Sequence, residues 1–71
     1  MNNSKFTDWG LKVKMELLKQ GKEQTWLCEE VTKRTGLYLD SGYIHKILTG
    51  QRNPPKIVSA INEILKIKTK A

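Results

Sequence analysis

The sequence predicts an all-α domain built from four to five short helices. Apolar residues recur at helical spacings of i, i+3 and i+4 along most of the chain, and no segment shows the alternation of a β-strand. The chain has 71 residues, the size of one small domain with one core. We therefore expect a single domain over residues 1–71, folded from about residue 6 to residue 67, with a basic tail at 68–71.

The first helix is predicted from about Thr7 to Gln20. Thr7 is a good N-cap residue, Asp8 suits the positive end of the helix dipole, and Gly21 is a typical stop. One face carries an apolar stripe of Phe6, Trp9, Val13 and Leu17. A second stripe consists of Leu11, Met15 and Leu18. It indicates either that the helix is covered on two faces or that it carries a contact patch.

The remaining helices are expected at about 24–33, 41–49 and 55–66. Gly50 ends the third helix, and Pro55 suits the first position of the fourth. Their inward residues are Leu27, Cys28 and Val31, then Ile44, Ile47 and Leu48, then Ile57, Val58, Ile61, Ile64 and Leu65. We expect one core in which Val13, Leu17, Leu27, Cys28, Ile44, Ile47 and Ile61 are buried together.

The charge of the chain favours a polyanionic partner. There are 13 Lys and Arg residues against 7 Asp and Glu, which gives a formal net charge of +6 and a pI near 9.7. Such a balance is typical of nucleic-acid-binding proteins, although many small proteins are simply basic. Charge supports non-specific attraction and does not define a base-reading surface.

Several other classes of protein find no support in the sequence. The single cysteine, Cys28, excludes an intramolecular disulfide, and the single histidine, His45, leaves no cluster with metal-ligand spacing. No uninterrupted apolar run exceeds three residues, so neither a membrane span nor a signal peptide is expected. No acid/base pair, nucleophile arrangement or phosphate loop indicates an enzyme. We expect a cytoplasmic, non-enzymatic protein without cofactor, metal or small-molecule ligand.

The outward face of the third predicted helix is the candidate base-reading surface. An α-helix fits the major groove of DNA, where a lysine can reach guanine O6 and N7. We assign base reading to Ser41, Gly42, Tyr43 and Lys46. Lys46 otherwise contacts phosphate, and Tyr43 contacts a phosphate or a thymine methyl, or packs at the core edge. Gly42 either permits close approach to DNA or only eases helix initiation after Asp40.

The segment that follows this helix is suited to hold the DNA backbone. The turn "GQRNPP" presents Gln51, Arg52 and Asn53, and Lys56 lies at the start of the fourth helix. Backbone amides near a helix N-terminus, together with Arg and Lys, bind phosphates without reading sequence. His45 and Thr49, at the edge of the third helix, are assigned to the same phosphate contacts.

Two segments carry motifs in the same order. "GKEQTWLCEEV" fits the pattern Gly-x-Thr-Gln-x-x-Leu-Ala-x-x-hydrophobic at Gly21, Gln24, Leu27 and Val31. "SGYIHKILTGQRNPP" fits Ser-x-x-Ile-Ser-x-Ile-x-Asn-Gly-x-Arg-x-Pro at Ile44, Ile47, Gly50, Arg52 and Pro54. Both patterns are typical of the lambda-repressor/Cro-like (XRE) helix-turn-helix family. The chain resembles this family from Trp9 to Leu65.

The resemblance implies a small phage or mobile-element regulator. Such a protein would be a sequence-specific repressor that reads the major groove of double-stranded DNA with helix 41–49. It would contact a phosphate with Gln24 at the tip of the second helix. It would also pair on two-fold DNA sites, so we expect a weak homodimer that forms on DNA or through the first or fourth helix.

One departure from the family concerns the connection between the second and third helices. Twelve residues separate Val31 from Ile44, about five more than this kind of helix-turn-helix usually has. We expect a lengthened turn in which Leu37 and Leu39 fold back over the core and Tyr38 is exposed.

Two other functions remain open from the residues alone. An accessory DNA-bending or recombination protein would use similar DNA contacts. A protein-binding adaptor would instead use Leu11, Met15 and Leu18 as its contact face. An adaptor has no need of an outward Gly42 and Lys46 beside Arg52, and this favours DNA binding.

Overall fold

The computed structural model describes residues 5–67. Within this range the protein is all-helical, with α1 at Asp8–Gln20, α2 at Gln24–Thr35, α3 at Ser41–Leu48 and α4 at Pro55–Leu65. This part of the chain contains no strand, so the all-α prediction is confirmed at the level of secondary structure. The predicted basic tail at 68–71 lies outside the described residues.

The helix ends follow the expected capping chemistry. The Thr7 side chain accepts a hydrogen bond from the Gly10 amide, and Gly21 closes α1 in the left-handed conformation with φ 67°. The second helix runs two residues further than predicted, to Thr35, because Gly36, with φ 75°, is its stop. The third helix ends one residue early, at Leu48, and Thr49 is its C-cap.

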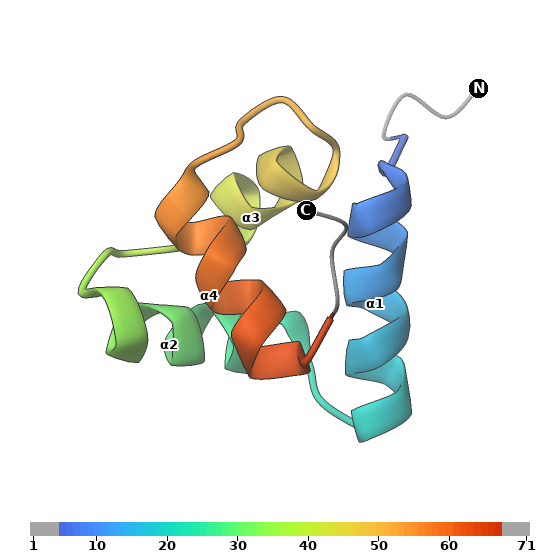
Figure 1. Ribbon diagram of the computed structural model, residues 1–71, viewed down its shortest axis with the longest axis horizontal. Coiled ribbons are helices and arrows are strands. Elements are labelled where there is room, and N and C mark those ends of the chain that lie inside the picture. The colour runs from blue at the N-terminus through green and yellow to red at the C-terminus, as the bar shows by residue number, and fades with distance from the viewer. Residues whose placement is uncertain (1–4, 68–71) are drawn as a thin grey trace.

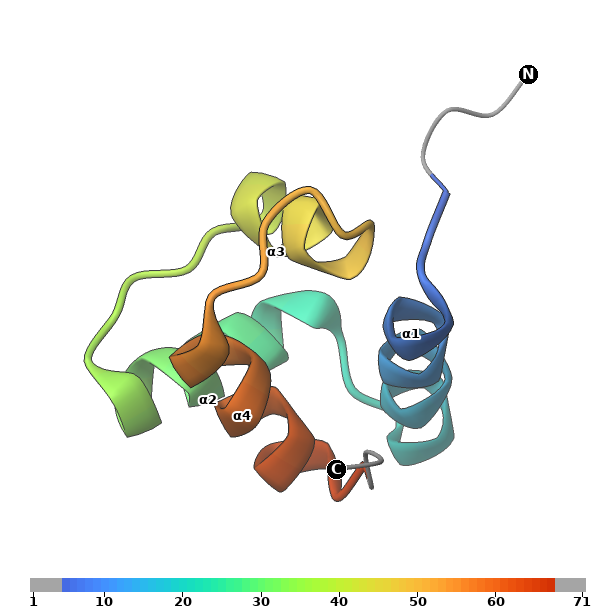
Figure 2. The same cartoon turned by 45° about the horizontal axis from the view of Figure 1, so that its top comes forward.

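The helices surround a single apolar cluster (Figure 1). Helix α2 packs against α4, while α1 lies along one edge of the molecule and contacts both α3 and α4. The turned view shows α3 above the α2–α4 pair (Figure 2). The core comprises Val13, Leu17, Leu27, Cys28, Val31, Leu39, Ile44, Ile47, Leu48, Ile57, Ala60, Ile61 and Leu65. All seven residues of the predicted core belong to it, so that prediction is confirmed.

Polar contacts fix α1 against the rest of the molecule. The Thr7 amide and hydroxyl both donate to the Leu48 carbonyl at 3.1 Å, which joins the start of α1 to the end of α3. The Trp9 indole donates to Asn62 Oδ1 at 2.6 Å and joins α1 to α4. A side chain at Gly10 would collide with the Leu48 carbonyl, so only glycine permits this close crossing of α1 and α3.

Candidate nucleic-acid interface

Helix α3 has one buried and one exposed face. Ile44, Ile47 and Leu48 are inside the core, whereas Ser41, Gly42 and Lys46 are exposed. Tyr43 and His45 are half-buried and flank these two faces. The Asp40 carboxylate accepts a hydrogen bond from the Tyr43 amide at 2.8 Å and caps the helix. The four residues assigned to base reading therefore lie together in the first two turns of a short, capped helix.

The loop after α3 folds back onto the helix that it leaves. The Gln51 and Arg52 amides both donate to the Lys46 carbonyl, at 2.8 and 3.2 Å. Gln51, Arg52 and Asn53 are exposed, as is Lys56 in the first turn of α4. The hydrogen bonds to Lys46 hold the loop beside the exposed face of α3. Gln51 and Arg52, assigned to phosphate binding, are thus held next to Lys46, assigned to base reading.

His45 and Thr49 are more engaged within the protein than the sequence indicates. The His45 ring packs edge-on against Phe6, with 5.6 Å between ring centroids. The Thr49 hydroxyl lies 3.1 and 3.2 Å from the His45 and Lys46 carbonyls, and it accepts from Gln51 Nε2 at 3.0 Å. Its single proton is directed at the helix end. The Thr49 hydroxyl can therefore only accept further hydrogen bonds. A phosphate oxygen needs a donor, so Thr49 does not suit the phosphate contact predicted for it.

The amide of Gln24 is oriented by a residue that the motifs do not indicate. Lys14 Nζ donates to Gln24 Oε1 at 3.3 Å and sits 5.0 Å from the centre of the Phe6 ring. With Oε1 accepting from a cation, the Gln24 NH₂ group is free to donate outward. The ammonium group, with three donors, keeps donors of its own. Lys14 and Gln24 together form a second cationic, donor-rich point at the N-terminus of α2.

Lys14 could not have been selected from the sequence. It lies in a helix with several other lysines, and a charge on the outer side of a helix ordinarily indicates a solvated face. Only the packing of α1 beside the start of α2 brings it to Gln24. The Phe6 ring, which lies between Lys14 and His45, extends this contact toward α3.

The charged side chains between residues 41 and 56 are all cationic. Residues 41–56 contain Lys46, Arg52 and Lys56 and no Asp or Glu. The ion pairs among residues 5–67 join Lys19 to Glu16, Lys33 to Glu30 and Arg34 to Glu63. None of them uses Lys46, Arg52 or Lys56, so within the described chain these three cations are not neutralised by a carboxylate.

The linker between α2 and α3 differs in part from the prediction. Leu39 is buried, with 3% of its surface exposed, and Tyr38 is 78% exposed, as expected. Leu37 is 41% exposed, so its predicted place over the core is wrong. Successive side chains of an extended segment point to opposite sides, and Leu39, next to the α3 cap, is the one that reaches the core.

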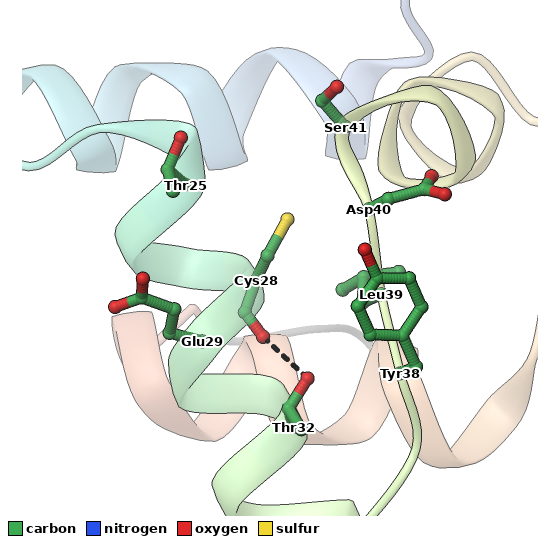
Figure 3. A pocket seen from close by; sticks show the side chains of 8 residues that line it. All are labelled: Thr25, Cys28, Glu29, Thr32, Tyr38, Leu39, Asp40 and Ser41. Atoms are coloured by element: carbon green, nitrogen blue, oxygen red, sulfur yellow. Dashed lines mark hydrogen bonds between the residues drawn. The ribbon is translucent and has the colours of Figure 1, made fainter.

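A cavity of about 540 Å³ lies between α2 and this linker (Figure 3). Thr25, Cys28, Glu29 and Thr32 line it from α2, and residues 38–41 line the other side. The Cys28 side chain points into the space between them. Burial, together with the nearby Asp40 and Glu29 carboxylates, raises the pKa of the Cys28 thiol. The thiol is therefore held neutral at physiological pH, as expected of a core residue rather than a reactive one.

The described part of the chain has neither a metal-ligand cluster nor a membrane-spanning helix. Among residues 5–67, no three His, Cys, Asp or Glu side chains are grouped so that they could hold a metal ion. In the same range no helix combines the length and the apolar character needed to cross a membrane.

Comparisons with protein-family models, curated proteins and solved structures give no match to this chain.

Proposed function

We propose that the protein is a sequence-specific double-stranded DNA-binding regulator that inserts α3 into the major groove. The observation that carries the proposal is the amphipathic construction of α3. Its apolar face is fixed in the core, and its exposed face carries Ser41, Gly42 and Lys46. A short helix held in this way can approach base edges with its N-terminal residues, as recognition helices do.

The phosphate contacts are proposed on both sides of α3. On one side, Arg52 and Lys56 provide unpaired cations, while Gln51 and Asn53 provide neutral donors. On the other side, Gln24 and Lys14 provide donors at the N-terminus of α2. Contacts at two separated points of the backbone fix the orientation of a helix in the groove, which base contacts alone do not. In this arrangement α2 and α3 act as a helix-turn-helix with a lengthened linker.

The biological role follows from the resemblance noted for the sequence. Regulators of the lambda-repressor/Cro-like family are commonly repressors in phages and mobile elements, and we propose this role here. A single α3 covers few base pairs, so two copies are proposed to occupy a two-fold site. An accessory DNA-bending protein would use the same surface, and bending of the selected duplex would distinguish it from a repressor.

The proposal is tested by selecting duplexes from a random pool and measuring affinity against salt. A specific regulator binds its selected duplex at least about 10³-fold more tightly than random duplex at physiological salt. The logarithm of each affinity should fall linearly with the logarithm of salt concentration. If every duplex stays in the non-specific range, the protein is not a sequence-specific regulator.

A further inference from the structure

Helix α1 exposes an apolar stripe on the side away from the core. Leu11, Met15 and Leu18 are 49%, 57% and 81% exposed. Their i, i+4, i+7 spacing places them in one row along the helix. Of the two possibilities that the sequence leaves open, cover by the described part of the chain is therefore excluded, and a contact patch is the one that remains. Single exposed leucines are ordinary on protein surfaces, but an aligned row of this kind is not.

A hollow of about 270 Å³ adjoins this stripe. Met15 forms part of its lining, with Ile67, which follows α4, on the opposite side. Lys12, Lys19 and Lys66 surround these apolar groups. Glu16 is the single carboxylate in the lining, and it is paired with Lys19 at 3.5 Å. The lining of the hollow thus combines two apolar side chains, Met15 and Ile67, with a net positive charge.

The charge of the rim disfavours a second copy of this chain as the occupant. Two-fold pairing through α1 would bring the same lysines of both copies together, in a protein that already carries a net charge of +6. Three exposed side chains and one hollow are also small beside the roughly 800 Å² per partner of a stable dimer.

The same features disfavour a membrane surface. Interfacial helices bury a broad apolar face, often with Trp or Phe, by about 5–10 Å in the headgroup region. Here the broad apolar face of α1, with Val13 and Leu17, is committed to the core. The remaining stripe is one residue wide and contains no aromatic residue. A stripe of this width fits the contact face of a single partner helix.

We propose that the α1 stripe and its hollow form a docking surface for an acidic amphipathic helix of another protein. Apolar residues of that helix would pack along Leu11, Met15 and Leu18, and one of them would enter the hollow beside Ile67. Carboxylates on its flanks would pair with Lys12, Lys19 and Lys66. The surface does not include the exposed face of α3, although Lys14, which is proposed to contact phosphate, lies beside Leu11 and Leu18 on the same helix.

The test uses a synthetic helical peptide with leucines at i, i+4 and i+7 and glutamates on both flanks. Its binding is followed by amide chemical shifts of the full chain. We expect saturable shifts in α1 and at residues 66–67. Leu18→Glu should weaken binding at least about tenfold, as loss of a central apolar contact does. Gln20→Glu, which adds the same charge to the same helix outside the stripe, should change it less than about twofold.

A second arm tests the role of charge and the other occupants. The same peptide with lysine flanks should not bind, and Lys12→Gln should weaken binding of the acidic peptide and reduce its salt dependence. Thermal melts of each variant verify that the fold is retained. Equal binding of both peptides, or equal effects of Leu18→Glu and Gln20→Glu, would overturn the proposal. So would stripe-dependent binding to anionic vesicles, or a stripe-dependent dimer in sedimentation, without peptide binding.

Discussion

Gly42 is the residue at which stability and DNA binding are expected to oppose each other. It lies in the first turn of α3, where a Cβ would meet Asp40 Oδ1 at an ordinary 3.6 Å. Neither a positive φ nor a steric clash in the protein therefore requires glycine there. In a helix, glycine costs up to about 1 kcal/mol relative to alanine. The close approach to DNA that we propose would account for this cost.

We predict that Gly42→Ala raises the free energy of unfolding by up to about 1 kcal/mol and weakens binding to the selected duplex. Urea unfolding and a binding titration on the same sample measure both effects. If the variant is more stable and binds DNA as tightly as the wild type, Gly42 only eases the start of the helix, and close approach is not its role.

Gly10 should respond in the opposite way to the same substitution. The Gly10 backbone lies so close to the end of α3 that a Cβ would overlap the Leu48 carbonyl. Gly10→Ala must therefore separate α1 from α3, and overpacking of this kind costs about 1–3 kcal/mol. Gly42→Ala serves as the matched control in the same unfolding experiment. Equal stability of Gly10→Ala and the wild type would show that the α1–α3 crossing is looser than described.

At the scale of helices, the apolar spacings were sufficient to predict the secondary structure. The spacing of apolar residues and the capping residues predict the four described helices because these signals are local. Thr7, Gly21 and Asp40 each act on the helix turn next to them. The error at the end of α2 has a local cause as well. The stop is Gly36 in the left-handed conformation, whereas the predicted range ends at residue 33.

Contacts between elements were not predictable in the same way. The Lys14–Gln24 pair and the close approach at Gly10 depend on how helices cross, which no spacing within one helix specifies. The linker shows the same limit. The sequence offers Leu37 and Leu39 as equivalent apolar residues, and only the path of the extended chain selects Leu39 for the core. The exposed face of α3 was predictable because its opposite face is strongly apolar.

The packing of α3 on the core predicts how strongly truncation of Ile47 destabilises the protein. Ile47 is 3% exposed and lies among residues of the other helices. Truncation to alanine leaves a cavity, and Ile47→Ala should cost about 2–5 kcal/mol. That is a large part of the stability of a domain of this size. A circular-dichroism melt should show a clearly lowered midpoint, and an unchanged midpoint would contradict the packing of α3 on the core.

In the whole molecule, the two proposed surfaces are formed mainly by different helices around one small core. The proposed DNA surface combines α3, the loop that follows it, the start of α2 and Lys14 of α1. The apolar stripe is on the outer side of α1, at the edge of the molecule (Figure 1). A partner helix on α1 would therefore leave the exposed face of α3 open. The net charge of +6 favours a polyanionic partner and opposes self-association.

The oligomeric state is expected to depend on DNA. In sedimentation without DNA, the chain should be monomeric at low concentration, because copies with a net charge of +6 repel each other. On a two-fold duplex, two copies should bind. A tight dimer at about nanomolar concentration without DNA, stable in the manner of obligate dimers, would contradict this expectation.

We propose above all that α3 contacts base edges while residues 51–56 bind phosphates. It is tested most directly by comparing Lys46→Ala with Arg52→Ala on the selected duplex, a single-base variant of it and random duplex, at several salt concentrations. Lys46→Ala should cost about 1–3 kcal/mol on the selected duplex and relax the preference at one or two base pairs. Arg52→Ala should weaken all three duplexes similarly and reduce the salt slope by about one unit. Equal losses on selected and random duplex for Lys46→Ala would contradict base reading by this residue.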